Sequence, residues 1–239
     1  MADYHVRMDA TSNLLIAALP EAERAHLLTL MHQEPLRIGD VLYEQGQIVS
    51  SIHFPLSGAV SLMIALEDGR EMEPAIIGSE GMLGFPIGRG DDISRWRSIV
   101  QVEGEALVMS RLRMRELLLA GGELPGILTH YAGQLITLTA QSAICAQFHT
   151  LEQRTARWLL LMHDRSLGDE FSRTHNHLAA MLGAFRPSET NALNALQHRG
   201  WIELGRSRIR ILNRAGLQGA ACECYARVEA HHAEEAPTP

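Results

Sequence analysis

The feature that most restricts the fold is a change in the spacing of apolar residues near residue 111. Between residues 34 and 110, short apolar runs recur about every ten residues, with glycine-containing turn signals between them. From residue 111 onward, apolar residues follow the three- and four-residue steps of helices. We therefore expect an α+β chain, with an antiparallel sandwich or barrel first and helices after it.

The expected strands are the apolar runs that the turn signals separate. They cover residues 38–43, 52–55, 60–64, 73–77, 98–102 and 105–109. Residues 11–33 predict two short helices, the first capped by Thr11 or Ser12 and the second opened by Pro20. Another short helix is expected over about 112–120, and residues 166–171 are expected to form a loop.

A long helix is expected to begin at Pro125 and to end near residue 149. One stripe along it follows alternating steps of three and four: Leu128, Tyr131, Leu135, Leu138, Ser142, Cys145 and His149. Such a stripe either packs on the chain's own sheet or forms the seam of a two-helix dimer. Its heptad regularity favours the dimer seam, for which we propose the residues from Leu128 to Cys145.

The segment 174–200 predicts a helix-turn-helix. Thr174 can cap a first helix over 175–182, Gly183 suits the left-handed residue after it, and Pro187 fits the first turn of a second helix over 186–196. The outward face of the second helix carries side chains that can hydrogen-bond to base edges and phosphates: Arg186, Ser188, Thr190, Asn191 and Asn194.

Residues 201–212 follow directly and alternate apolar and basic side chains after a Gly-Arg turn. This pattern predicts a hairpin wing, with Arg206 and Arg208 placed for phosphate contact. Upstream, Thr150 and Gln153 form a capping-box pattern that restarts a helix. We therefore predict a hinge at 149–151 and three parts: 1–124, a long helix over 125–150, and a DNA-binding domain over 151–239.

Charge is divided unevenly between the two halves. The formal net charge is −7, and all 21 basic residues are arginines. Residues 1–150 hold 10 arginines and 18 acidic residues, whereas residues 151–227 hold 11 arginines and 7 acidic residues. The negative net charge of the whole chain argues against nucleic acid as a partner. A basic segment within an acidic chain, however, favours a separate DNA-binding module.

In this order of parts the chain resembles the Crp/Fnr family of transcription regulators over about residues 14–226. The residues that carry the resemblance are 39–46, 58–60, 66–71, 178–183, 199–202 and 208–212, and the Cys222-Glu223-Cys224-Tyr225 end resembles a rhizobial-type branch. The resemblance implies a cyclic-nucleotide-binding-like β-roll, a dimerisation helix and a winged helix-turn-helix. It also implies double-stranded DNA and a second copy of the chain as partners, with RNA polymerase as a further candidate.

By position in the family, Thr174 and Asn176 match residues that hold phosphates, and Arg186 matches the arginine that reads bases. Pro187 replaces the family's base-reading glutamate and Asn191 replaces its second arginine, so the commonest family operator is not expected. We still expect a roughly palindromic operator with half-sites one or two helical turns apart. Glu189 would repel phosphate on a DNA-facing helix, so it either faces inward or reads a cytosine amino group.

The family's effector site is altered in this chain. Cyclic-nucleotide members carry a Phe-Gly-Glu turn, whose N–H groups hold the phosphate, and a downstream arginine. Here the turn reads Leu83-Gly84-Phe85, with Pro86 after it, and Arg97-Ser98 keeps the arginine position. Phe85 replaces the ribose-binding glutamate and Pro86 removes an N–H. We therefore predict that the chain does not depend on cAMP; its effector stays unknown, and no cofactor is predicted.

No metal site is predicted. Cys145 stands alone on a helix, Cys222 and Cys224 lie near the end, and three cysteines are one short of a four-thiolate cluster. Haem on His149 or Cys145 would rest on single residues. No enzyme motif is present, which leaves a ligand-sensor module without DNA output as the alternative. Without a signal-peptide pattern or a long apolar run, we expect a cytoplasmic protein with no membrane partner.

Overall fold

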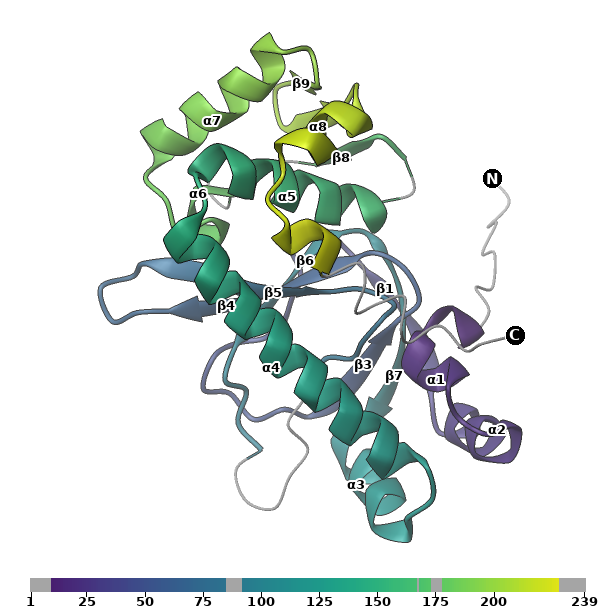
Figure 1. Cartoon of the computed structure of the whole chain (residues 1–239). Helices are drawn as coiled ribbons and strands as arrows, with labels where there is room; N and C mark the ends of the chain where they lie inside the picture. The colour runs from purple at the N-terminus through teal and green to yellow at the C-terminus, as the bar shows by residue number, and fades with distance from the viewer. Residues whose placement is uncertain (1–9, 85–91, 167, 173–177, 228–239) are drawn as a thin grey trace.

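The computed structural model describes residues 10–84, 92–166, 168–172 and 178–227. Antiparallel strands form its N-terminal half, one long helix crosses them, and a helical domain with a small sheet lies at the far end of that helix (Figure 1). The predicted α+β architecture of β-roll, long helix and winged helix-turn-helix is confirmed.

The β-roll consists of two antiparallel sheets. Its strands in the described chain are β1 (His32–Leu36), β2 (Val41–Tyr43), β3 (Ser51–Pro55), β4 (Ala59–Ala65), β5 (Glu71–Ile77), β6 (Arg97–Val102) and β7 (Gly104–Ser110). One sheet has the order β1-β7-β3 and the other has the order β2-β6-β4-β5. The apolar faces of the strands enclose the first core of the chain.

Strand β1 was not expected from the sequence. Its residues show no alternation of apolar and polar side chains, and four of the five are exposed. Its place at the edge of the sheet explains this, because an edge strand needs little apolar surface and tolerates Pro35. The run expected to start at Ile38 begins only at Val41, since Gly39 turns the chain with φ of 88°.

Short helices cover the ends of the β-roll. They are the 3-10 turn η1 (Ala10–Ser12), α1 (Leu14–Ala17), α2 (Glu21–Thr29) and α3 (Arg111–Ala120). The predicted cap of the first helix was wrong: Asn13, not Thr11 or Ser12, accepts hydrogen bonds from the N–H groups of Leu15 and Ile16. The Asn13 side chain is fully buried and also donates to the carbonyls of Pro55 and Gly81, which ties α1 to the β-roll.

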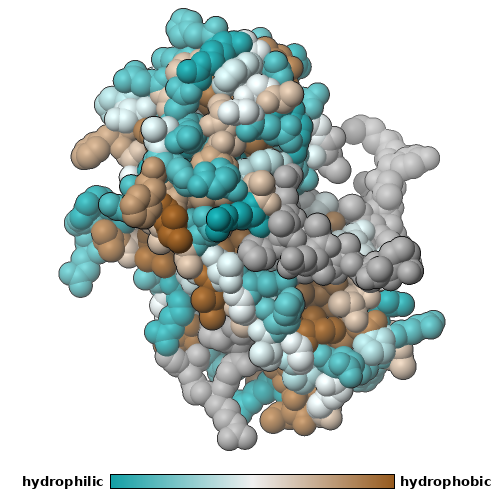
Figure 2. Space-filling model, viewed as in Figure 1, coloured by the Kyte–Doolittle hydropathy of each residue, from teal (hydrophilic) through white to brown (hydrophobic). Residues whose placement is uncertain are grey.

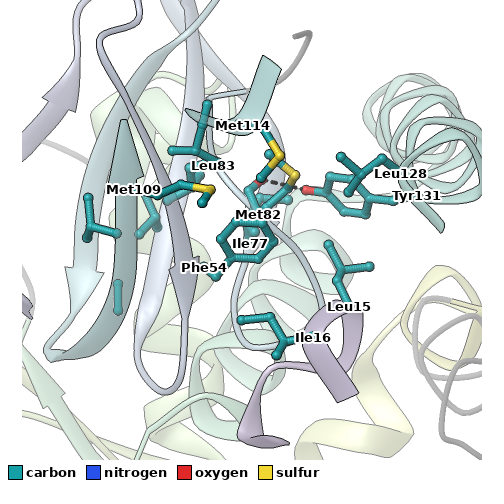
Figure 3. Close-up of a cluster of buried hydrophobic side chains, with 14 of the residues drawn as sticks. Leu15, Ile16, Phe54, Ile77, Met82, Leu83, Met109, Met114, Leu128 and Tyr131 are labelled. Carbon is teal, nitrogen blue, oxygen red and sulfur yellow. Dashed lines mark hydrogen bonds between the residues drawn. The ribbon is translucent and has the colours of Figure 1, made fainter. Parts of the chain in front are cut away.

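The apolar stripe of α4 (Leu124–Phe148) packs inward, so its assignment as the dimer seam was wrong. Leu128, Tyr131 and Leu135 lie in the β-roll core, where the Tyr131 hydroxyl donates to the Met82 carbonyl at 2.8 Å (Figure 3). Farther along, Leu138 is half-buried against the second core, and Ser142 and Cys145 are buried. A stripe regular enough for a coiled coil thus lies against its own sheets, because those sheets need a cover.

The C-terminal domain contains the predicted helix-turn-helix and wing. Its elements are α5 (Leu151–Asp164), β8 (Glu170–Ser172), α6 (Leu178–Met181), α7 (Arg186–His198), β9 (Ile202–Leu204), β10 (Arg208–Ile211) and α8 (Arg214–Ala220). Both hydrogen bonds of the predicted capping box at Thr150 and Gln153 are present. The prediction of a loop over 166–171 was wrong for its last two residues, which belong to strand β8. This strand pairs with the wing in a sheet of order β8-β10-β9.

The C-terminal domain rests directly on the β-roll. One core cluster combines Met63 and Ile76 of the β2-β6-β4-β5 sheet with Trp158 and other buried residues of α5. Arg165 and Glu80 form an ion pair of 2.6 Å across this contact, and both side chains are about nine-tenths buried. Within the described residues, no helix has the length and apolarity that crossing a membrane requires.

The inward stripe yields a prediction about stability. Leu128→Ala should lower the free energy of unfolding by about 2–5 kcal/mol, because it leaves a cavity in the β-roll core. Leu119→Ala on α3 is the matched control: its side chain is 72% exposed, and its effect should stay within about 0.5 kcal/mol. Urea denaturation of both variants measures this, and equal losses would contradict the inward packing.

Candidate nucleic-acid interface

Helix α7 presents a polar outer face and an apolar inner face. Ala192, Leu193 and Leu196 are buried against the domain, and Pro187 lies in the first turn, as predicted. The outer face exposes the predicted side chains Arg186, Ser188, Thr190, Asn191 and Asn194. Glu189 is only 2% exposed, so it faces inward, and its assignment as a reader of cytosine is excluded. The exposed face therefore combines one cation with neutral hydrogen-bonding groups.

A tight turn sets α7 apart from α6. Gly183 has φ of 56°, the left-handed conformation expected after a helix, and the Ala184 N–H donates to the Ala179 carbonyl at 2.8 Å. Phe185 then caps α7 without a side-chain hydrogen bond and is 84% exposed. The predicted phosphate contacts Thr174 and Asn176 lie outside the described residues.

The wing follows α7 and is fixed to it by one side chain. The Gln197 side-chain oxygen accepts a hydrogen bond of 2.8 Å from the Leu204 N–H, which holds β9 beside the end of α7. Arg206 lies exposed in the turn between β9 and β10 and forms no ion pair with a described residue. Arg208 is also exposed, but it pairs with Glu170 of β8 at 3.4 Å. The two predicted phosphate contacts therefore differ in electrostatic environment.

The C-terminal end of α7 is fixed to α5. Arg199 forms an ion pair with Glu152, and its guanidinium lies 5.0 Å from the centre of the Trp201 ring. This arrangement links α7, the start of the wing and α5. The end of α7 is therefore held against α5 by side-chain contacts. Figure 2 shows mainly hydrophilic side chains over this end of the molecule.

The outer face of α4 was missed by the sequence reasoning. Its exposed residues are Gly126, Thr129, His130, Gly133, Ile136, Thr137, Ala140, Ala143, Ile144, Gln147 and Phe148. None of them is Asp, Glu or Arg, and Ile136 and Phe148 are 68% and 76% exposed. The seven-residue spacing of Gly126, Gly133 and Ala140 was the available signal, but the more apolar stripe on the inner face obscured it.

Among the described residues, the chain's own side chains fill most of the space of the predicted effector pocket. Leu83 and Ser98 are buried, and Phe85 lies outside the described residues. The cavity beside Leu83, Gly84 and Ser98 measures about 10 Å³, enough for about one water molecule. Arg97 does not face an open anion site, because it lies 3.1 Å from Glu44 and 3.8 Å from Glu71.

A polar pair fixes the interior of the β-roll next to this cavity. The Tyr43 hydroxyl donates to the Ser51 carbonyl at 2.7 Å and lies 2.7 Å from His53 Nδ1. Burial lowers the pKa of His53 to about 4, so the imidazole is neutral at physiological pH. This part of the described interior is therefore packed and uncharged, whereas a nucleotide needs a pocket of several hundred Å³.

A buried carboxyl group lies where the β-roll meets the C-terminal domain. Glu73 of β5 accepts hydrogen bonds from the Ser61 hydroxyl and from Trp158 Nε1, the latter at 3.0 Å. Burial raises the pKa of Glu73 to about 7, against the opposing effects of these donors and of Arg157 and Arg165. The interface thus contains a carboxyl group whose charge changes near neutral pH.

Comparisons with known proteins agree with this arrangement of domains. A family profile described as a cyclic nucleotide-binding domain matches residues 33–120, and one described as a Crp-like helix-turn-helix domain matches residues 153–220. The cyclic AMP receptor protein of Thermus thermophilus is 26% identical over 186 residues, which cover 77% of this chain and 85% of that protein.

Solved structures share the fold at low sequence identity. FixK2 from Bradyrhizobium japonicum has a TM-score of 0.66 at 17% identity, and the match covers 80% of this chain and 98% of FixK2. A transcriptional regulator of the CRP family from Thermus thermophilus has a TM-score of 0.66 at 19% identity, covering 79% of this chain and 96% of that one. The order of β-roll, long helix and winged helix-turn-helix is therefore shared with known regulators.

The buried carboxyl group predicts a pH dependence of stability. The folded state holds the Glu73 proton more tightly than the unfolded chain, whose carboxyl has the ordinary pKa of 4.5. Protonated Glu73 therefore stabilises the folded state fully below about pH 4.5. As the pH rises to about 7 this contribution is lost, and the free energy of unfolding falls by at most about 3 kcal/mol. Glu73→Gln, which resembles the protonated form, should remove this part of the dependence.

The measurement is urea denaturation of both proteins at several pH values between 5 and 8. The difference in stability between Glu73→Gln and the parent chain should grow with pH, because histidines and other carboxyl groups affect both proteins alike. A difference that is constant across this range would show that Glu73 does not titrate there.

Proposed function

Because this chain belongs to the Crp/Fnr family of transcription regulators, we propose that it binds a roughly palindromic DNA operator as a homodimer, through residues 186–196 of each copy. The observation that carries this proposal is the exposed face of α7. It offers one arginine and four neutral hydrogen-bonding side chains, while the one carboxylate of the helix is turned inward. Such a face can enter the major groove without repelling phosphates.

We assign base reading to the exposed face of α7. Arg186 can donate two hydrogen bonds to the O6 and N7 atoms of guanine, and Asn191 and Asn194 can pair with adenine. Pro187 occupies the first turn and offers neither a side-chain donor nor an N–H. We therefore propose that the chain reads an operator different from those of family members that carry a glutamate at this position.

The wing and the start of the first helix are assigned to the DNA backbone. Arg206 is exposed, and we propose that it contacts a phosphate beside the groove that α7 occupies. Arg208 would join it only after giving up its contact with Glu170. Thr174 and Asn176 remain proposed phosphate contacts from the family resemblance. As a DNA-binding regulator, the chain is proposed to act in the cytoplasm.

We propose that dimers form through the outer face of α4 rather than through the inner stripe. Glycine and alanine at every seventh position let two helices approach closely, and the places where side chains would start at Gly126 and Gly133 are open. Two copies of α4 packed side by side would cover Ile136 and Ile144 on each chain. The dimer would place two α7 helices at the two half-sites.

Cyclic AMP is not proposed as the effector. A bound nucleotide needs a pocket of several hundred Å³, whereas the described interior beside Leu83 and Ser98 leaves about 10 Å³. The arginine that would hold the phosphate is already paired with two carboxylates. Activity without a cyclic nucleotide would follow from both features.

The DNA proposal predicts different effects for two arginines. Arg186→Ala should lose about 1–3 kcal/mol of discrimination between the operator and other sequences, whereas Arg206→Ala should weaken all sequences alike and flatten the dependence on salt. Gel-shift titrations with genomic DNA fragments, at several salt concentrations and with no added nucleotide, measure both effects. Arg113→Ala on α3 is the control, since it removes an exposed arginine from the other domain. Absence of salt-sensitive binding by the parent chain would refute the proposal.

The dimer proposal predicts that Ile136→Arg produces monomers, because two buried arginines would face each other across the seam. Folding should be preserved, since Ile136 is 68% exposed within one chain. Leu119→Arg on α3, at a side chain that is 72% exposed, should leave the dimer intact. Sedimentation velocity separates the two states, and a dimer that survives Ile136→Arg would exclude this face.

A further inference from the structure

Three cysteines and one histidine lie together at the C-terminal end of α4. They are Cys145, His149, Cys222 and Cys224, and their ligand atoms all lie within 4.8 Å of one another. The three cysteines are buried, with at most 3% of each residue exposed. The expectation that Cys145 stands alone was wrong, because the segment after α8 returns to α4 and brings Cys222 beside it (Figure 1).

The backbone holds these four side chains in place before any ligand is considered. Cys145 and His149 are one helical turn apart, so they lie on one face, and the His149 N–H still donates to the Cys145 carbonyl. Cys222 and Cys224 flank a turn in which the Tyr225 N–H donates to the Cys222 carbonyl at 3.0 Å. The Tyr225 hydroxyl then bonds to Asp164 of α5 at 3.1 Å, which fixes the segment.

The distances fit a tetrahedral metal ion. Zinc bonds of about 2.3 Å to sulfur and 2.0–2.1 Å to nitrogen place tetrahedral ligand atoms roughly 3.5–3.8 Å apart. Cys145 Sγ lies 3.5 Å from Cys222 Sγ, and Cys224 Sγ lies 3.5 Å from His149 Nδ1. A disulfide would require a sulfur–sulfur distance of about 2 Å. Thiolate and imidazole are the ligands of structural zinc sites of the Cys3His type.

The surroundings resemble the second layer of a metal site. His149 Nε2 lies 3.2 Å from a Glu223 carboxylate oxygen, which leaves Nδ1 directed at the sulfur atoms. A carboxylate in this position fixes the orientation of a metal-binding histidine. The Gln141 side chain donates to Cys224 Sγ at 2.9 Å, a bond that favours a thiolate.

From this geometry we propose that Cys145, His149, Cys222 and Cys224 bind one zinc ion. The site joins the end of α4 to the C-terminal segment of the DNA-binding domain, on either side of the junction at residues 149–151. The bound ion would clamp this segment to α4 and limit rotation of the domain about that junction. The proposal concerns metal binding and holds whether or not the operator proposal does.

The test is metal analysis of the full-length chain purified under reducing conditions. About one zinc ion per chain is expected, together with release of that ion when the thiols are modified. Replacement by Co²⁺ should give the strong visible bands of tetrahedral cobalt and thiolate-to-cobalt charge-transfer absorption. This readout uses the parent chain and does not depend on whether a variant folds.

Variants assign the ligands. Cys224→Ser and His149→Gln should each weaken zinc binding by about tenfold or more in competition with a chromophoric chelator, and Glu223→Gln should weaken it by about tenfold. His26→Gln on α2 is the matched control, because its side chain is exposed and lies outside the cluster. It should bind zinc as the parent chain does.

Two results would overturn the proposal. One is a reduced chain that neither contains zinc nor binds added Zn²⁺ or Co²⁺ while circular dichroism shows it folded. The other is a purified chain two mass units lighter, with Cys145 and Cys222 joined in a disulfide that reduction does not convert into a metal-binding form. The first result would mean that the three cysteines only pack together as thiols. The second would mean that they form a disulfide instead of a metal site.

Discussion

The packing of α4 on the β-roll determines how the rest of the chain is arranged. Tyr131 and its neighbours on the inner stripe fill the core, and the hydrogen bond to the Met82 carbonyl fixes the rotation of the helix about its axis. With that rotation set, the outer face of the helix, which carries no Asp, Glu or Arg, stays exposed. The same rotation directs Cys145 and His149 toward the segment after α8. One buried stripe thus decides what each other face of the helix can contact.

A second contact controls how the two domains lie together. Trp158 of α5 reaches the buried carboxyl group of Glu73, and Arg165 pairs with Glu80 beside it. Buried charges are stable only when they are paired or protonated, so this interface depends on its partners remaining in place. The interface between the domains lies close to the helix-turn-helix, because α6 also packs on β5, the strand that carries Glu73. A change in one domain would therefore alter the burial of charged groups in the other.

Features that depend on a few neighbouring residues could be predicted from the sequence. The capping box at Thr150, the position of Pro187 and the alternation of the wing each depend on local backbone preference, and each appears in the structure. Features that depend on contacts between residues far apart in the sequence could not be predicted. The stripe of α4 has the same spacing whether it faces a sheet or a partner helix. Cys145 and Cys222 are 77 residues apart, and only the return of the chain after α8 brings them together.

The two arginines of wing strand β10 lie beside acidic side chains of the neighbouring strands. Arg208 and Arg210 lie 3.4 and 3.3 Å from carboxylate oxygens of Glu170, and Arg210 also lies 3.8 Å from Glu203. Phosphates approaching β10 must compete with these acidic groups for the arginines, so the two positions contribute less attraction than their charges alone imply. Weak nonspecific attraction shortens the time a regulator spends at unrelated sites. If β10 contacts DNA as proposed, Glu170 and Glu203 would favour faster exchange between sites over tighter holding at any one of them.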